Sequence, residues 1–470
     1  MTGEFWADVI DDYEKLFDTE EGYDTIFYVG ENGNVVHAHS VILRIRSQYF
    51  RTAFSNKRVD KNNGMFIFSK RNIDLQVFKI ILKFIYCGNV KLTDLQGSEI
   101  LKIIIGSEEF NVQQLINYAK KFLNENKLKF LVSQPIEIFK IIHKNSSLFT
   151  KLWDDYLEII CVKPEIIFSS KKFPSIDESL LKDLLKCKAY KIEESKIWEN
   201  VLKWGISKHP TFDQNINNLN KEQLKILKVT LNDIIPLIEF DYFDSTDVYQ
   251  KVLPYKKLLS KDMINYLLKK FLDKSNSIRC CHRTRYHKVS PSIMLTPYHC
   301  AVFANWIDKE SNSHYKIHNN PYKFKLLISK HVDKGMNLFP VFQSALSRAK
   351  ATLIVARIKD SDKLVGGYNP NGFSRQKSNK FARDSFLFYF GDKDEVKSGR
   401  CGYVSQPENA VYYNERLEPA FGNGPDLLCK NDGNWTSKPT SYPSIGIPSN
   451  FEILHYEAFQ VIKDCEISNV

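Results

Sequence analysis

Residues 24–54 read DTIFYVGENGNVVHAHSVILRIRSQYFRTAF, and this stretch decides the fold at the start of the chain. Its first residues, 25–29, are the β-branched and aromatic types that favour a strand. The following Asn and Gly residues at 31–34 tolerate the positive φ of a tight hairpin, so we expect the chain to return as a second strand. After Ser40, apolar residues recur at helical spacing. The order of strand, hairpin and helix predicts a small α/β unit.

The residues of this stretch resemble the opening of the BTB/POZ domain, a dimerising α/β module. That resemblance implies that His39 is a packed, hydrogen-bonded residue and not a catalytic base. A later apolar helix ends at Gly88, as in the same family. We therefore predict a BTB/POZ domain over residues 1–126. The positions that match the family pattern in order are Asp24, His37-Ala38-His39, Leu43, Arg46-Ser47 and Tyr49-Phe50.

The segment that precedes this module is acidic and amphipathic. Its apolar side chains would be left partly exposed in a monomer, and such exposure is typical of an interface. Together with the BTB/POZ resemblance, this pattern predicts a homodimer. The predicted dimerisation residues are Phe5, Trp6, Val9, Ile10 and Phe17.

Length and composition limit the class of protein. A chain of 470 residues favours about three domains. The net charge of +11 comes from 66 basic and 55 acidic residues, and because both signs are interspersed we expect no nucleic-acid or membrane-surface partner. No apolar run approaches the ~18 residues of a membrane span, and the acidic N-terminus does not resemble a signal peptide. Nine scattered cysteines without a CxxC pair predict a reducing compartment, the cytosol or the nucleus.

Residues 127–273 keep a helical period, and prolines separate the apolar segments. This pattern predicts an all-α domain. Ile192-Glu193-Glu194, Trp198-Glu199, Val201 and 203–205 resemble the BACK domain, the usual helical follower of BTB/POZ. We expect Trp198 and Trp204 to pack in its core, and Ser260 to cap the last helix.

Residues 274–291 contain several basic residues and no acid, which predicts a linker. A mobile tether is the main expectation, and a basic recognition strip is the alternative. Cys280-Cys281-His282 and His287 do not make a zinc motif, because the side chains of adjacent cysteines point to opposite sides and a second ligand pair is missing.

The sequence pattern of residues 292–470 predicts a mainly-β sandwich with a few helices, for example at 339–349. Residues 352–358 are apolar on both faces, so we expect a central strand there. The region resembles the TLDc domain, although Phe373 stands where that family commonly has Trp. The matching positions are 350–353, Gly366-Gly367-Tyr368, 385–388, Phe421-Gly422 with Asp426-Leu427, and Glu457 with Phe459.

Two glycine-containing loops of this region are the predicted site of protein binding. Glycines let a partner approach the backbone closely, and Tyr is a common interface anchor. The alternative is that these loops only close the sandwich. The predicted residues are Gly366, Gly367, Tyr368, Gly422 and Asp426.

The sequence has no catalytic motif such as a P-loop, a nucleophile elbow or HExxH, so we predict no catalytic, cofactor or metal site. Glu457 alternates with apolar residues and is expected on a buried face, as a satisfied structural residue or a hidden acid. The alternative is that a bulge in the strand turns it outward. Cys401 and Cys429 lie near Arg400 and Lys430, whose charges would lower a thiol pKa and favour redox sensing.

The order of the three resemblances predicts a non-enzymatic adaptor. BTB-BACK proteins often join a cullin-type ubiquitin ligase scaffold to a substrate held by a third domain. Here Val59-Asp60-Lys61 replaces the hydrophobic-x-Glu motif of good cullin binders, which argues against that role. The alternative is a TLDc-type regulator of oxidative-stress resistance or of the vacuolar proton pump. An enzyme of unknown chemistry is a third reading without a motif.

Overall fold

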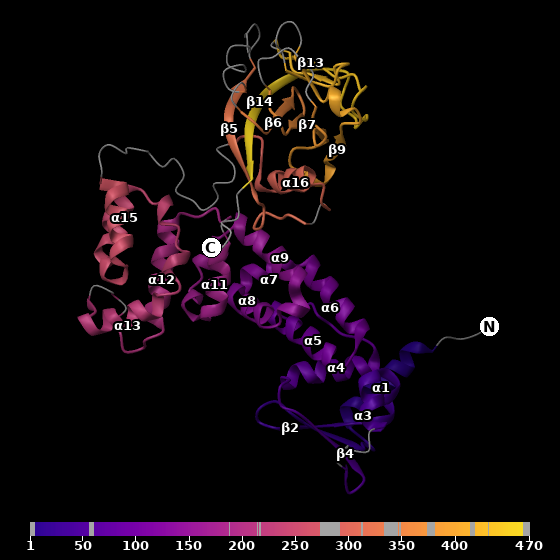
Figure 1. Cartoon of the computed structure of the whole chain (residues 1–470). Helices are drawn as coiled ribbons and strands as arrows, with labels where there is room; N and C mark the ends of the chain where they lie inside the picture. The colour runs from indigo at the N-terminus through magenta and orange to yellow at the C-terminus, as the bar shows by residue number, and fades with distance from the viewer. Residues whose placement is uncertain are drawn as a thin grey trace, which may run out of the picture. The chain divides into compact units, whose positions relative to one another are not determined.

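The computed structural model describes residues 5–55, 61–187, 189–213, 215, 218–272, 292–311, 314–332, 346, 349–373, 381–413, 419–430 and 432–463, and Figure 1 labels their elements. The chain divides into two compact units. The first unit comprises residues 1–185, 196–237 and 257–259, and the second comprises 186–195, 238–256 and 260–470. The predicted linker at 274–291 and the residues Val59 and Asp60 lie outside the described residues, so both expectations stay predictions.

The first unit begins with the expected α/β module. Its strands are β1 (Thr25–Val29), β2 (Asn34–Ala38), β3 (Lys61–Asn62) and β4 (Met65–Lys70), and its helices are α1 (Trp6–Thr19), α2 (Ser40–Arg46), α3 (Gln48–Ser55), α4 (Leu75–Cys87), α5 (Gly97–Glu109) and α6 (Gln113–Glu125). The sheet order is β2-β1-β4-β3, with β1 and β4 parallel. Gly33 has a φ of 63°, the left-handed conformation that the predicted hairpin requires.

The residues that match the BTB/POZ pattern in sequence stabilise the start of this module through hydrogen bonds. Asp24 accepts hydrogen bonds from the backbone nitrogen and the hydroxyl of Ser40, at 2.7 and 2.5 Å, which ties the start of α2 to the start of β1. The ring nitrogens of His39 lie 2.8 Å from the Tyr86 hydroxyl and 2.7 Å from the carbonyl oxygen of Glu21. His39 is buried. The prediction that it is a packed, hydrogen-bonded residue is therefore confirmed.

The described residues of the range 127–272 form helices joined by short connections, as predicted. The helices are α7 (Lys127–Ser133), α8 (Pro135–Lys144), α9 (Ser146–Val162), α10 (Glu165–Phe168), η1 (Phe173–Ser175), α11 (Glu178–Lys186), α12 (Glu194–Ser207), α13 (Lys221–Leu231), η3 (Ile235–Leu237), η4 (Phe240–Tyr242), α14 (Ser245–Asp247), η5 (Val248–Val252), η6 (Leu253–Leu258) and α15 (Lys261–Leu272). The Ser260 hydroxyl accepts a hydrogen bond from the Met263 nitrogen at 3.1 Å, as expected of a cap. Trp198 and Trp204 are buried, which confirms their place in the core.

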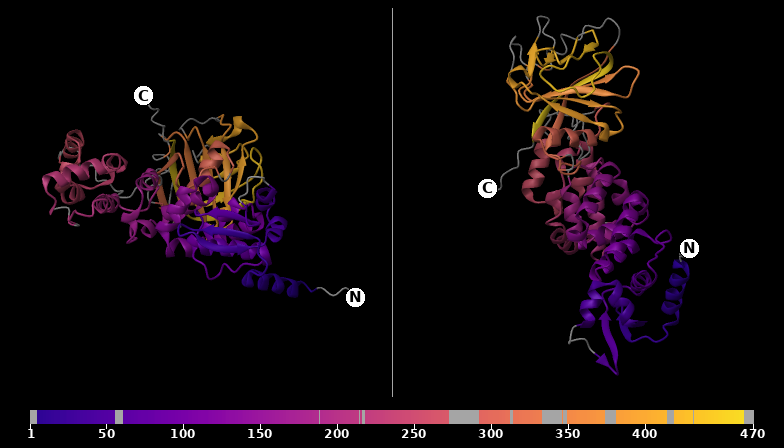
Figure 2. Two further views of the ribbon diagram at one scale, coloured as in Figure 1. Left: turned by 90° about the horizontal axis from the view of Figure 1, so that it is seen from below. Right: turned by 90° about the vertical axis from the view of Figure 1, so that its right-hand side faces the viewer.

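The C-terminal region is built of strands, drawn in orange to yellow in Figure 2. They are β5 (Tyr322–His331), β6 (Thr352–Ile358), β7 (Leu364–Asn369), β8 (Phe386–Phe390), β9 (Arg400–Tyr403), β10 (Val411–Tyr413), β11 (Pro419–Phe421), β12 (Leu427–Leu428), β13 (Asn434–Thr436) and β14 (Asn450–Lys463). The sheet order is β10-β11-β12-β13-β14-β6-β7-β8-β9, and β5 pairs with β14. The central position predicted for 352–358 is confirmed, because β6 lies between β14 and β7. Two short turns, η8 (Val396–Ser398) and η9 (Pro407–Asn409), flank β9 and β10.

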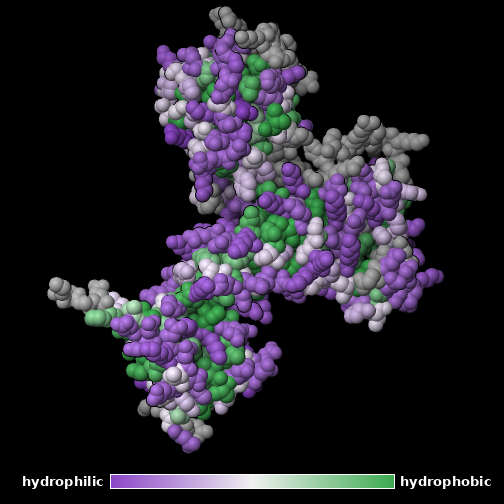
Figure 3. Space-filling view, turned by 180° about the vertical axis from the view of Figure 1, so that it is seen from behind, coloured by the Kyte–Doolittle hydropathy of each residue, from purple (hydrophilic) through white to green (hydrophobic). Residues whose placement is uncertain are grey.

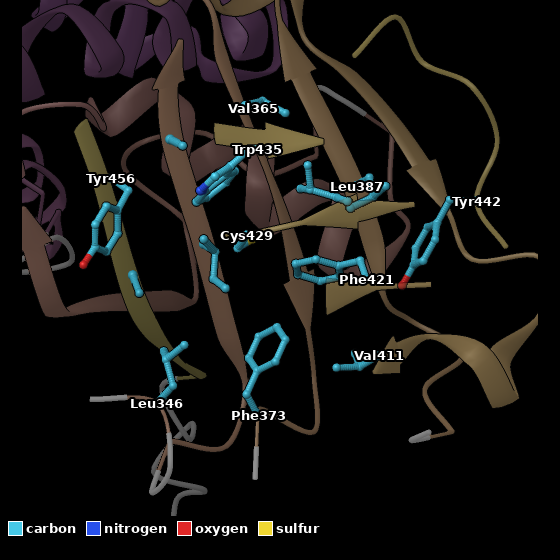
Figure 4. Packing of buried hydrophobic residues seen from close by; sticks show 14 of the residues in the cluster. Leu346, Val365, Phe373, Leu387, Val411, Phe421, Cys429, Trp435, Tyr442 and Tyr456 are labelled. Atoms are coloured by element: carbon cyan, nitrogen blue, oxygen red, sulfur yellow. The ribbon is translucent and has the colours of Figure 1, made fainter. Parts of the chain in front are cut away.

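Two cores cover opposite faces of β6, β7 and β8. On one face, helix α16 (Pro297–Asp308) packs Phe303 against Phe388, with ring centroids 4.8 Å apart. On the other face, residues of β10 to β13 close over the sheet, and Phe373 meets Phe421 edge-on at 5.4 Å (Figure 4). Helix α16 is not expected from the sequence pattern, and the helix predicted at 339–349 falls almost wholly outside the described residues.

Candidate protein-binding surfaces

Helix α1 presents apolar side chains to solvent. Phe5, Trp6 and Val9 are 70%, 71% and 46% exposed, and Ile10 is half-buried. On the face drawn in Figure 3, hydrophilic residues predominate and hydrophobic ones emerge in separate patches. An apolar helix face left in water is a feature of interaction sites. The exposure of these residues is thus compatible with a role in dimerisation, which stays a prediction.

Phe17, the remaining predicted dimerisation residue, holds α1 to the module. Its ring meets Tyr86 of α4 edge-on, with centroids 5.3 Å apart. One turn earlier, the Glu14 carboxylate accepts a hydrogen bond from Lys83, which raises the pKa of that lysine. These contacts fix the inner face of α1 and leave its outer face available.

Two other apolar groups of the module are exposed, at positions outside the predicted dimerisation residues. Val41 and Ile45, one turn apart on α2, are 59% and 65% exposed. Tyr28 and Val35 pair across β1 and β2 and also face solvent. The spacing of Val41 and Ile45 is the signal that could have marked a second apolar stripe.

The glycine pair predicted to form a binding loop lies inside β7. Gly366, Gly367 and Tyr368 are buried between β6 and β8. A Cβ on Gly366 would lie 1.9 Å from the carbonyl oxygen of Ile354, so glycine is needed there for strand packing. The expectation of an exposed loop at these three residues is wrong, because side chains from both cores cover them.

Gly422 and Asp426, the second predicted loop, are also buried. Asp426 accepts hydrogen bonds from the backbone nitrogens of Thr440, Ser441 and Tyr442 at 2.5, 2.8 and 2.8 Å. Gly422 has a φ of 76°, and a Cβ there would lie 1.7 Å from the Asp426 carboxylate. Both residues are buried, and Asp426 is bonded to residues 440–442, so the expectation of an exposed binding loop is wrong here as well.

Glu457 is fully buried, and its carboxylate is satisfied. The strict alternation expected along β14 does not hold, because the pairing shifts register between Ile453 and His455 and between Ala458 and Phe459. One oxygen accepts a hydrogen bond from the Ser292 hydroxyl at 2.5 Å. The other accepts from the Ile293 nitrogen and the Ser329 hydroxyl, both at 3.1 Å. Of the readings from sequence, the satisfied structural carboxylate fits these contacts. It joins the segment that enters α16 to β14 and β5.

Ser329 and His455 lie close together beside Glu457, but the three residues do not form a catalytic triad. The His455 Nε2 atom lies 2.9 Å from the Ser329 hydroxyl and 3.9 Å from the Glu457 carboxylate. In a Ser-His-acid triad the serine and the acid contact opposite ring nitrogens, whereas here both approach the same nitrogen. Burial also lowers the pKa of His455. This group therefore stabilises the pairing of β5 with β14.

The two cysteines considered for redox sensing are not activated thiols. Burial raises the pKa of Cys401 to about 12, opposite to the shift expected from Arg400. Cys429 is buried in the core drawn in Figure 4. A reactive cysteine needs a lowered pKa and access to solvent. The expectation of redox sensing is therefore wrong for Cys401, because its pKa is raised, and wrong for Cys429, because it is buried.

A cleft of about 1070 Å³ opens in the helical part of the first unit. It lies between the start of α11, the end of α12 and α13. Trp204 was assigned from sequence to the core alone, and the cleft was not predicted. The available signal is Lys208, one helical turn after Trp204, a spacing that brings a cation beside an indole. The lining residues are Asp177, Glu178, Trp204, Lys208, Lys225, Lys228, Val229, Thr230, Asn232 and Asp233.

The fold and contacts of the first module agree with a family match: a model of the BTB/POZ domain matches residues 13–127. Those residues are a BTB/POZ domain. Phe17 lies within the matched range, whereas Phe5, Trp6, Val9 and Ile10 precede it. The match does not extend to the helical or C-terminal regions, so their likeness to BACK and TLDc domains stays a proposal.

Relatives share this part of the chain. Protein maternal effect lethal 26 of Caenorhabditis elegans is 29% identical over 122 residues, which cover 25% of this chain and 29% of the relative. BTB/POZ and MATH domain-containing protein 6 of Arabidopsis thaliana is 27% identical over 118 residues, covering 22% and 27%. The chain thus spans less than a third of either relative. The structure of the BTB domain of human Gigaxonin is 17% identical, covers 26% of this chain and 95% of its own, and has a TM-score of 0.21.

Proposed function

We propose that the chain is a non-enzymatic adaptor that self-associates through its BTB/POZ domain and holds a protein partner with its C-terminal region. The observation that carries self-association is the exposed outer face of α1, where Trp6 is 71% and Val9 is 46% exposed. Burial of this face against a second copy would be favourable by about 25 cal/mol for each Å² of apolar surface removed from water.

Light scattering of the full chain at micromolar concentration tests this proposal. We expect the wild type to be a dimer and the double variant Trp6→Glu/Val9→Glu to be a monomer, because buried charges without partners oppose association. Val132→Glu is the matched control, since Val132 is 57% exposed on α7. It should stay dimeric. A monomeric wild type, or a dimeric double variant, contradicts the proposal.

We propose that the helical region is a BACK-type domain and that the C-terminal region is a TLDc-type domain, with a cullin-type ubiquitin ligase scaffold as one candidate partner. The order of a helical region and a mainly-β region after the BTB/POZ domain supports this reading. The mainly-β region equally supports the alternative, a regulator of oxidative-stress resistance or of the vacuolar proton pump. Affinity capture from cell extract, probed for a cullin and for pump subunits, distinguishes the two. If neither a cullin nor a pump subunit is recovered, both proposed roles are contradicted.

The absence of turnover is part of the proposal. It is supported by the contacts of Glu457, which three donors satisfy, and by the arrangement of Ser329 and His455 at a single ring nitrogen.

A further inference from the structure

The cleft between α11, α12 and α13 holds a lysine in an unusual setting. The Lys208 ammonium donates to the carbonyl oxygens of Ile176 and Pro174, at 2.8 and 3.2 Å, and lies 4.8 Å from the centre of the Trp204 ring. Burial lowers the pKa of Lys208. Its partners are neutral dipoles, and no carboxylate within the described ranges forms an ion pair with it. Two bonds to carbonyl oxygens leave the third ammonium hydrogen for a ligand.

A second uncompensated cation lines the same cleft. The Lys228 ammonium donates to the carbonyl oxygen of Leu259 at 3.0 Å and, among the residues that the structure describes, has no acidic partner. Lys225 pairs with Glu222 at 2.8 Å, but both side chains are more than 70% exposed. Such an exposed pair is weak and readily exchanged for another anion.

Three acids and three lysines line the cleft, so the lining has no net charge. Lys182 binds both Glu178 and Asp233, at 2.7 and 2.9 Å, and neutralises one of their two charges. Asp177 attracts Lys208 from an exposed position. The positive charge of the cleft is therefore local, at Lys208 and Lys228, whose ammonium groups donate to carbonyl oxygens and form no ion pair within the described residues.

Apolar surface lies beside this charge. Val229 is 77% exposed on α13, whereas Trp204 lines the cleft but is only 1% exposed. The lining contains no arginine, the residue that best matches the planar, bidentate recognition of phosphate. Lysine ammonium groups next to an exposed valine suit carboxylates that alternate with an apolar side chain.

We propose that this cleft binds an acidic peptide segment of a partner protein, with carboxylates on Lys208 and Lys228 and an apolar side chain against Val229. The site shares no residue with α1, so it does not depend on the proposed self-association.

The test measures fluorescence anisotropy of a labelled peptide in which Glu alternates with Leu, titrated with the full-length chain. We expect saturable binding that weakens as salt is added. A peptide with Gln in place of Glu, and one with Ser in place of Leu, should each bind more weakly.

Variants of the chain locate the site. Lys228→Gln should weaken binding about threefold, as expected for a solvated charge pair. Lys208→Gln, which removes a half-buried cation, should weaken it about tenfold. Lys221→Gln, an exposed lysine on α13 outside the lining, is the matched control and should bind as the wild type does. Thermal melts establish that each variant is folded.

The proposal is overturned if folded Lys228→Gln and Lys208→Gln both keep wild-type affinity, or if Lys221→Gln loses as much as they do. It is also overturned if the Gln peptide binds as tightly as the Glu peptide, if a phosphoserine peptide binds and the Glu peptide does not, or if the wild type binds none of these probes.

Discussion

His299, at the start of α16, is a neutral histidine sealed into the C-terminal core. It is fully buried, and its Nδ1 atom accepts a hydrogen bond from the Thr296 nitrogen at 3.2 Å. The ring proton must then lie on Nε2, which has no hydrogen-bond partner among the described residues. Phe390 meets the imidazole edge-to-face, with centroids 4.9 Å apart. Burial among carbon atoms, with one ring nitrogen unpartnered within the described part of the chain, disfavours the charged imidazolium.

This burial predicts a loss of stability in acid. It lowers the pKa of His299 from 6.5 to about 4. Between these values the unfolded chain binds a proton that the folded chain excludes, so stability present above pH 6.5 falls as the pH drops toward 4. We expect this residue to contribute a loss of about 2 kcal/mol between pH 7 and pH 5.

Denaturant unfolding of the C-terminal region at these two pH values measures the loss. His299→Phe should reduce the difference between the two values, because the titrating group is gone. His314→Phe, at an exposed histidine, should leave the difference unchanged. An equal pH dependence in wild type and His299→Phe contradicts the assignment.

At the scale of the element, β7 depends on close approach to its neighbours. A Cβ added at Gly366 would meet the Ile354 carbonyl oxygen at 1.9 Å and the Phe388 ring at 2.8 Å. Neither can move away while β7 stays paired with β6 and β8, so Gly366→Ala should lower the free energy of unfolding by about 2 to 3 kcal/mol.

Gly391→Ala is the control for this prediction. The nearest atom to a Cβ at Gly391 is the Ser398 Cβ at 3.8 Å, an ordinary contact. We expect a change of less than about 0.5 kcal/mol there. Equal melting temperatures for Gly366→Ala and the wild type would show that the strands can separate at β7.

The same strand shows which elements a sequence can predict. The opening hairpin and β6 were predicted correctly, because their turn residues and apolar faces are local signals. The glycines of β7 look like loop residues until Phe421 of β11 packs against Gly367, and that contact joins strands distant in sequence. The cleft could not be predicted from the sequence for the same reason, since Lys208 donates to a carbonyl oxygen 32 residues earlier in the chain.

Two features of the first unit define how the whole molecule would act. The outer face of α1 offers an apolar surface to a second copy, and the cleft beside Trp204 offers charge to an acidic peptide. A dimer formed through α1 carries two such clefts. If both are engaged on one surface, the second binding event becomes intramolecular and benefits from a high effective concentration.

The two proposals together predict avidity. On a sensor surface with dense Glu-Leu peptide, the wild type should dissociate more slowly than Trp6→Glu/Val9→Glu by about tenfold or more, because both clefts of a dimer are held at once. On a sparse surface the two proteins should dissociate at the same rate, since the cleft itself is unchanged. Surface plasmon resonance at the two densities makes the comparison, with Val132→Glu expected to follow the wild type. If a dimeric wild type and a monomeric double variant leave the dense surface at equal rates, then the dimer does not present two clefts to one surface.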